Sequence, residues 1–233
     1  NLKGIFKEKY NLITGLKKPA IAILNADDIF LRKVVFRKTK STFVLGVGLK
    51  NKSDFCASGI KCICGNPPLT EFRVNGRFKF ALKTLGYYNI YNSLLAIAVG
   101  RIFGLGYRDI ASSLSAFNLP EGRLNFTEIK KIKFIDDSYN ANPLSLKQAL
   151  GVLENFFVPG RKIFVMGDML ALGQASKPLH AQAIKDALKI CDTLITVGEI
   201  TKSCLNRRIR GNKNIFTCKT SSQARQILCK KVC

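Results

Sequence analysis

Short apolar runs alternate with helix-length amphipathic segments through the second half of this 233-residue chain. Strands are expected at 132–135, 163–166, 193–197 and 214–217, and helices at 143–156, at 177–190 and from Ser221 or Ser222 onward. Helices of this length between strands imply right-handed crossovers and a parallel sheet. Asn142 is expected to cap the helix at 143–156, with Pro143 in its first turn. The chain is therefore predicted to have an α/β fold.

The first half follows a different pattern. Apolar runs at 20–24 and 42–47 predict strands, and residues 70–80 predict a β-hairpin because their apolar side chains share one face around Asn75-Gly76. Helices are expected at 89–103 and 107–117. The polar segment Asn118-Leu-Pro-Glu-Gly122 separates the two patterns. A domain boundary is therefore predicted near residue 119, giving domains 1–119 and 120–233.

The chain is strongly basic, with 38 Lys and Arg against 15 Asp and Glu and a net charge of +23. Such a charge suits nucleic-acid binding through release of counterions, but it also suits a Lys-rich surface that favours an anionic small substrate. Nine basic residues lie between Lys202 and Lys231 without the interleaved aromatic residues that a base-stacking surface requires. We therefore expect no nucleic-acid partner.

Other features of the composition limit the class of protein. The 47% hydrophobic content allows a sizeable core, whereas the apolar runs are shorter than the roughly 20 residues of a membrane span. The chain begins with Asn, and its only methionines are Met166 and Met169, so it is expected to be a piece of a longer protein. Its eight cysteines are too sparse for a disulfide scaffold, and Cys56, Cys62 and Cys64 match a zinc site poorly.

Two polar, turn-rich segments follow predicted strands. They read Asp-Asp-Ser-Tyr-Asn-Ala-Asn-Pro at 136–143 and Gly-Asp-Met-Leu-Ala-Leu-Gly at 167–173. Ligands of open α/β sheets bind outside the carboxyl ends of the strands. Carboxylates placed there are able to hold a ribose or a metal ion, although Asp and Asn in such segments also serve ordinary turns and helix caps.

Three further residues are candidates for nucleotide contacts. Arg123 lies in the predicted linker, where a guanidinium can bind a phosphate through two hydrogen bonds, unless it is simply solvated. Asn89 and Asn92 share one side of a predicted first helical turn and are able to read a base edge, although capping by Asn89 is the alternative. Neither a Walker A loop nor a GxGxxG motif occurs in the sequence.

These segments, in this order, resemble the Mur ligase family, and within it the type that adds D-alanyl-D-alanine. The matching segments are Leu-Asn-Ala-Asp-Asp at 24–28, Gly-Tyr-Tyr-Asn-Ile-Tyr-Asn-Ser-Leu-Leu-Ala at 86–96, Gly122-Arg123, 136–143, and 167–173 with His180 downstream. Segment 136–143 is the most specific of them, and the resemblance covers nearly the whole chain. It implies the later part of a central ATPase domain followed by most of a Rossmann-like C-terminal domain.

The resemblance implies ATP-dependent, ADP-forming amide synthesis. In the implied reaction, ATP phosphorylates the terminal carboxylate of UDP-N-acetylmuramoyl-tripeptide, and the amine of D-alanyl-D-alanine then displaces phosphate from the acyl phosphate. ATP and Mg²⁺ are the implied cofactors, because cations must offset charge on the transferring phosphoryl group. The resemblance further implies a cytoplasmic, monomeric enzyme of peptidoglycan precursor synthesis.

The resemblance also implies roles for individual residues near ATP. Asn89 and Asn92 would contact adenine, Arg123 would lie at the phosphates, and Asp137 would hold the ribose or orient the nucleotide. ATP is therefore expected in a cleft between two lobes. Because Arg123 would lie near the ATP phosphates, the resemblance also implies a catalytic role for it.

The remaining implied site residues concern substrate and metal. Asn140, Asn142 and Asp168 are assigned to substrate binding. Lys9 aligns with the lysine that the family carbamylates, which replaces a cation with an oxygen ligand for magnesium and gives Lys9 a catalytic role. A solvated surface lysine is the alternative for Lys9.

Two positions depart from the pattern of the family: Tyr88 replaces a His, and Ala171 replaces an acid. The phosphate loop of the family would precede residue 1, and its Lys-Gly-Ser segment would follow Cys233, so this piece alone is expected to be inactive. Two alternatives stay open. They are another amide ligase of the Mur and folylpolyglutamate type, and a basic nucleic-acid-binding module.

Overall fold

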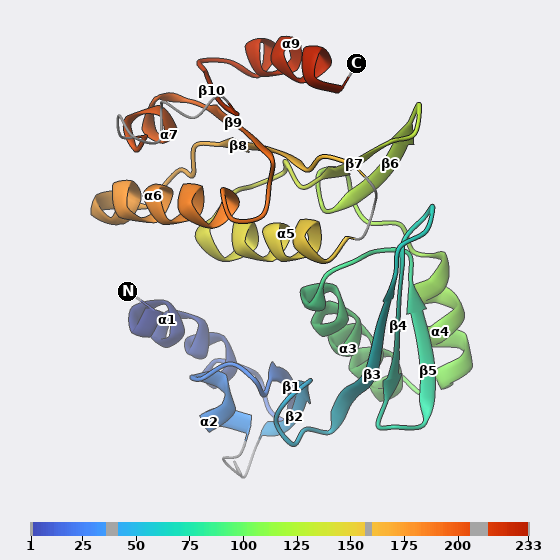
Figure 1. Ribbon diagram of the computed structural model, residues 1–233. Coiled ribbons are helices and arrows are strands. Elements are labelled where there is room, and N and C mark those ends of the chain that lie inside the picture. Colours follow the sequence, from blue (N-terminus) through green and yellow to red (C-terminus); the bar gives the residue numbers. More distant parts are fainter. Residues whose placement is uncertain (1, 36–41, 157–159, 206–213, 233) are drawn as a thin grey trace. The chain divides into compact units, whose positions relative to one another are not determined.

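The computed structural model describes residues 2–35, 42–156, 160–205 and 214–232 (Figure 1). The chain divides into two compact units, Asn1–Asn118 and Leu119–Cys233, which are called unit 1 and unit 2 below. Each unit has its own sheet and its own hydrophobic core.

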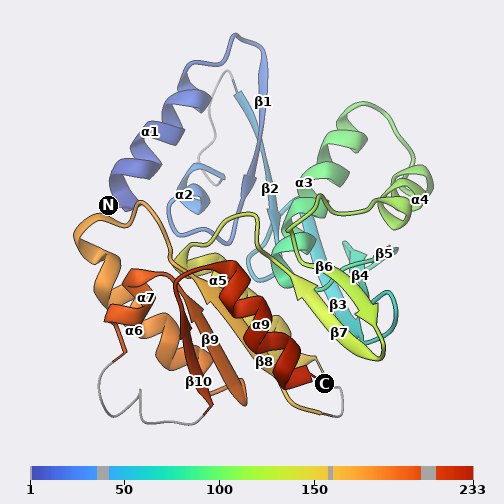
Figure 2. The same cartoon turned by 90° about the horizontal axis from the view of Figure 1, so that it is seen from above.

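Unit 1 contains a five-stranded sheet in the order β1-β2-β3-β4-β5. Its strands are β1 (Ala20–Asn25), β2 (Thr42–Gly48), β3 (Phe55–Ile63), β4 (Leu69–Val74) and β5 (Phe78–Leu82). The first three run parallel, and β3, β4 and β5 are antiparallel. Figure 2 shows β1 and β2 side by side. The carboxyl ends of β1 and β2 consequently lie at one edge of the sheet.

Unit 1 also contains helices, and the longest of them packs on this sheet. They are α1 (Leu2–Thr14), α2 (Leu31–Val35), α3 (Tyr87–Ile102) and α4 (Tyr107–Ala116). Ile90, Leu94 and Ile97 of α3 are fully buried and pack with Phe72 and Phe80 of the hairpin β4–β5. The rings of this cross-strand pair stack at 5.6 Å. The predicted hairpin around Asn75-Gly76 is thus confirmed, and it forms the centre of the core.

Unit 2 contains a parallel sheet in the order β10-β9-β8. Its strands are β8 (Ile163–Gly167), β9 (Thr193–Val197) and β10 (Ile215–Cys218), and its helices are α5 (Pro143–Asn155), η1 (Gly173–Ala175), α6 (Ser176–Ala187), α7 (Glu199–Ser203) and α9 (Ser221–Val232). Leu194 packs toward α5 and α6, whereas Ile195 packs toward α9. Because successive strand residues point to opposite faces, helices cover both faces of this sheet (Figure 1).

The strand predicted at 132–135 is present but does not join the parallel sheet. It is β7 (Ile132–Asp136), which pairs antiparallel with β6 (Asn125–Ile129) in a separate two-stranded sheet. Lys130 and Lys131 form the turn between them, both at positive φ. A two-residue turn joins only antiparallel strands, so the prediction of a parallel strand here was wrong.

The composition of the chain led to expectations about membrane spans and about disulfide bonds. Among the helices that the structure describes, none combines the length and apolar character needed to cross a bilayer. Cys56 and Cys62 lie on β3, and Cys64 follows it directly. These three and the other described cysteines are free thiols.

Candidate functional site

Arg123 and Asp137 lie together at the base of the β6–β7 hairpin. Two hydrogen bonds join the segments that carry them: Leu124 N–H donates to Asp137 Oδ1 at 3.2 Å, and Tyr139 N–H donates to the Gly122 carbonyl at 3.1 Å. The Arg123 guanidinium carbon lies 4.1 Å from the centroid of the Tyr139 ring. The structure therefore places a cation, a carboxylate and an aromatic ring in one cluster.

Gly122 makes this close approach possible. Its φ is +71°, and a Cβ atom there would lie 2.8 Å from the Tyr139 nitrogen. Real Cβ atoms do not come this close to a backbone atom, and positive φ favours glycine. Gly122 and Tyr139 were not among the predicted site residues, although both lie inside the segments that carry the family resemblance.

The Asp137 carboxyl is partly buried. Burial raises its pKa above the ordinary value, and the charge of Asp136 adds to the rise, whereas the Leu124 hydrogen bond and the Arg123 charge lower it. A carboxyl group in this setting accepts a hydrogen bond strongly because little water competes for it. Asp137 is consequently suited to accept a hydrogen bond from a ligand hydroxyl.

The two asparagines of this segment have different surroundings. Asn142 caps α5: its Oδ1 accepts from the backbone N–H groups of Leu144 and Ser145, both at 3.0 Å, and Ser145 Oγ accepts from Asn142 N–H. The predicted cap is confirmed, and it occupies the side-chain oxygen of Asn142. Asn140 is exposed in the loop before α5.

Asn89 and Asn92, the predicted pair in unit 1, also have different surroundings. α3 begins at Tyr87 with Gly86 as its N-cap, and Asn89 is buried, donating to Thr84 Oγ1 at 3.1 Å and to the Leu85 carbonyl at 2.9 Å. Capping by Asn89 was therefore wrong, because the helix starts two residues earlier. Asn92 is exposed on the same helix.

Asp27, which follows β1, is the most heavily hydrogen-bonded carboxylate of unit 1. It accepts from the backbone N–H groups of Leu49 at 2.6 Å and Asn51 at 2.8 Å, and from the Tyr91 hydroxyl at 2.8 Å. Burial alone would raise its pKa, but these bonds lower it to about 2. Burial and the adjacent carboxylate raise the pKa of Tyr91. The loops after β1 and β2 are thus tied to α3, a link that sequence reasoning missed.

The lowered pKa of Asp27 predicts acid sensitivity in unit 1. The native carboxyl titrates at about 2 rather than 3.8, so its stabilisation is fully present above about pH 4.5 and is lost as the pH falls toward 2. After allowance for solvent screening we expect a loss of about 1–2 kcal/mol. Urea unfolding at pH 6 and pH 2.5 measures it. Asp27→Asn should lack this part of the pH dependence, whereas the exposed-residue control Asp109→Asn should keep it.

Asp168, after β8, reaches across to the first turn of α7. Its carboxylate accepts from the backbone N–H groups of Ile200 at 3.0 Å and Thr201 at 2.8 Å. A side chain on Gly198, which has φ +114°, would collide with this carboxylate. Both oxygens of Asp168 therefore serve as a helix cap, and its role in substrate binding stays a prediction.

His180 holds the loop after β8 from the other side. It is fully buried on α6, and its Nε2 accepts from Met169 N–H at 2.8 Å. Because a backbone N–H can only donate, the ring proton is on Nδ1, which lies 2.7 Å from the Ser176 carbonyl and donates to it. His180 is thus a structural residue of this strand-end loop.

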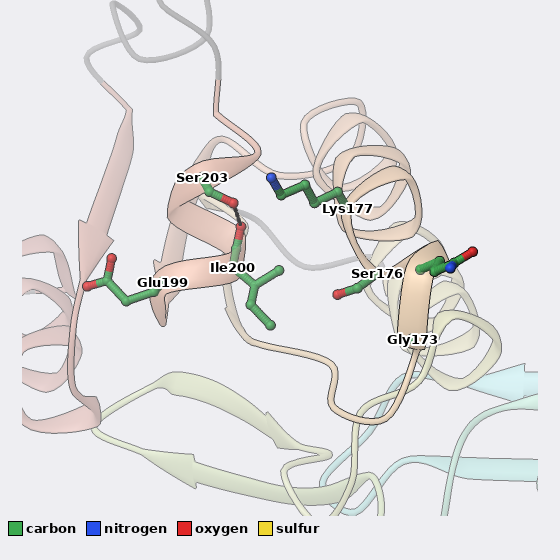
Figure 3. Close-up of a pocket in the computed structure, with 7 residues that line it drawn as sticks. Gly173, Ser176, Lys177, Glu199, Ile200 and Ser203 are labelled. Atoms are coloured by element: carbon green, nitrogen blue, oxygen red, sulfur yellow. Dashed lines mark hydrogen bonds between the residues drawn. The ribbon is translucent and has the colours of Figure 1, made fainter.

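A cavity of about 440 Å³ opens beside the segments that Asp168 and His180 hold. It is lined by residues of η1, α6 and α7: Gly173, Gln174, Ser176, Lys177, Glu199, Ile200 and Ser203. Figure 3 shows Lys177 and Ser176 pointing from α6 toward α7, and Ile200 pointing back toward them. The cavity is open to solvent, and it lies past the carboxyl ends of β8 and β9, where ligands of parallel sheets bind.

Lys9 is exposed on α1. Across residues 2–35, 42–156, 160–205 and 214–232, no group of three or more His, Cys, Asp or Glu side chains could hold a metal ion. Lys9, Asn89 and Asn92 belong to unit 1, and Arg123, Asp137, Asn140, Asn142 and Asp168 belong to unit 2.

Two domains of the Mur ligase family match this chain. The Mur ligase middle domain matches residues 1–100, and the Mur ligase glutamate ligase domain matches residues 122–232. The order of the two matches follows the order of units 1 and 2 along the chain. Both units are therefore covered by one family of ligases.

The curated relatives include ligases named for the addition of D-alanyl-D-alanine. The UDP-N-acetylmuramoyl-tripeptide–D-alanyl-D-alanine ligase of Bacillus subtilis (strain 168) is 30% identical over 202 residues, which cover 85% of this chain and 42% of the relative. The ligase of the same name from Escherichia coli (strain K12) is 30% identical over 205 residues, covering 85% and 44%. This chain thus spans less than half the length of these relatives.

Solved structures show the same likeness. A crystal structure of MurF from Acinetobacter baumannii superposes with a TM-score of 0.83 at 26% identity, covering 99% of this chain and 50% of that one. The MurF ligase from Thermotoga maritima in complex with ADP gives a TM-score of 0.75 at 23% identity, covering 92% and 48%, and shows the fold. The predicted α/β fold class is confirmed.

Proposed function

Because this chain belongs to the Mur ligase family, we propose that it serves the ATP-dependent joining of D-alanyl-D-alanine to UDP-N-acetylmuramoyl-tripeptide, in the cytoplasm. The observation that carries the proposal is the cluster of Arg123, Asp137 and Tyr139 within the segments shared with the family. Relatives named for this activity support the choice of substrates.

Arg123 and Asp137 have different proposed roles in ATP binding. Arg123 binds the phosphates, because its charge has no carboxylate partner within 4 Å among the described residues. Asp137 accepts a hydrogen bond from a ribose hydroxyl. In unit 1, Asn92 is exposed on α3 and stays a candidate for an adenine contact, whereas the buried Asn89 holds the turn before that helix.

The cavity between α6 and α7 is our candidate for the dipeptide site. Lys177 supplies a positive charge for the carboxylate of the dipeptide, and Ser176 supplies a hydroxyl. Asp168 shapes this site from behind, through its bonds to α7. Asn140 is the second candidate for a substrate contact, since its side chain is exposed beside the cluster segment.

In the proposed reaction, Mg²⁺ binds together with ATP. Mg²⁺ keeps much of its water and is commonly held by one or two carboxylates together with substrate phosphates. The described residues form no metal cage, so such an ion would depend mainly on phosphate oxygens and water. Lys9 stays a candidate ligand in a carbamylated form.

The test is phosphate release from ATP by this chain and by the longest protein encoded in its reading frame. We expect release by the longer protein to require both UDP-N-acetylmuramoyl-tripeptide and D-alanyl-D-alanine, and the 233-residue chain alone to be inactive. Equal activity with a single amino acid or glutamate would indicate another amide ligase. Salt-sensitive nucleic-acid binding without any response to ATP would contradict the proposal.

A further inference from the structure

We propose that Tyr139 is a positioning residue for Arg123, whose ring holds the guanidinium in place for an incoming phosphate. This inference rests on the proposed function, because it assumes that Arg123 acts on ATP. The guanidinium carbon lies 4.1 Å from the ring centroid, well inside the range of a cation–π contact. Tyr139 is itself 69% exposed, so the ring is not there to fill a core.

The backbone around the pair fixes both partners. Tyr139 N–H donates to the Gly122 carbonyl on one side of Arg123, and Leu124 N–H donates to Asp137 on the other. Arg123 N–H donates to Asn125 Oδ1 at 3.1 Å. The two segments are thus joined on either side of Arg123, at Gly122 and at Leu124. The ring and the guanidinium start from Cα atoms whose separation is set by the fold.

An aromatic partner suits this task better than a carboxylate would. The face of a π system attracts a cation without cancelling its charge, whereas a carboxylate at hydrogen-bond distance would compete directly with a phosphate. No described ion pair includes Arg123. The ring therefore limits the rotamers of a long side chain without holding its guanidinium in a described ion pair.

A double-mutant cycle in the longer protein that has ligase activity tests whether Tyr139 positions Arg123. Tyr139→Leu should lower kcat about threefold to tenfold, because a surface cation–π contact and the alignment it gives are of that size. Tyr139→Phe keeps the ring and should retain kcat. In an Arg123→Ala background, Tyr139→Leu should have no further effect, because the group that the ring positions is gone. The thermal unfolding midpoint of Tyr139→Leu should match that of the parent.

Each alternative outcome is distinct. Additive losses in the two backgrounds, or a kcat loss that follows a lower unfolding midpoint, would mean that Tyr139 is only structural. Loss in Tyr139→Phe would mean that the hydroxyl acts and the ring does not. Normal ligation by Arg123→Ala would instead overturn the role of Arg123 in the proposed function, whatever Tyr139 does.

Discussion

Arg123→Ala is expected to lower ATP-dependent ligation by about two to three orders of magnitude in kcat, the usual cost of removing one group that stabilises charge in a transition state. The guanidinium is fixed on Tyr139 beside Asp137 and has no described carboxylate partner to share its charge. Steady-state phosphate release with saturating substrates measures the effect. Arg123→Lys should recover only part of the rate, because lysine keeps the charge without the planar pair of donors.

Arg225→Ala is the matched control for this experiment. Arg225 is exposed on α9 in the same unit, so its loss changes net charge by the same amount without touching the cluster. We expect it to leave kcat within about twofold of the parent, as is usual for surface changes. Equal losses in both variants would show that general electrostatic attraction, and not placement, explains the effect.

His180→Ala is expected to destabilise unit 2 by about 3 kcal/mol. The change leaves a cavity where a fully buried ring was, and it leaves the Met169 N–H without its acceptor in a buried position. Urea unfolding measures the loss, and amide exchange at Met169 reports on unit 2 separately from unit 1. His180→Gln, whose side-chain oxygen can replace Nε2 as acceptor, should be milder.

Lys185→Ala, on the exposed face of the same helix, serves as the control and should change stability by less than about 0.5 kcal/mol. If His180→Ala behaved like this control, the buried hydrogen bond would not be what holds the loop after β8. Unchanged amide exchange at Met169 in His180→Ala would lead to the same conclusion.

Elements with strong local signals were predictable from the sequence. The Asn75-Gly76 hairpin and the Asn142 cap both depend on residues close in the chain, and both are confirmed. The helix α1 and the strands β3 and β6 were missed. β6 ends in a Lys130-Lys131 turn, which lacks the glycine or asparagine that usually marks such a hairpin.

The candidate site was harder to predict because its contacts join distant residues. The segment 136–143 was recognised, but nothing local shows that Tyr139 N–H meets Gly122 or that its ring lies against Arg123. Asp168 contacts residues more than thirty positions away. An acidic side chain after a strand has the same appearance in a sequence whether it binds substrate or caps a helix.

The bond between Asp168 and α7 has a mechanical consequence. A five-residue helix is too short to be stable by itself, and here its capping group comes from the neighbouring strand-end loop. The positions of Glu199, Ile200 and Ser203 on α7 therefore depend in part on the loop after β8. The α7 wall of the cavity is thus hydrogen-bonded to the loop after β8, and this loop leads into η1 and α6, which form the other wall. A shift of either strand end would therefore move residues on both sides of a bound molecule.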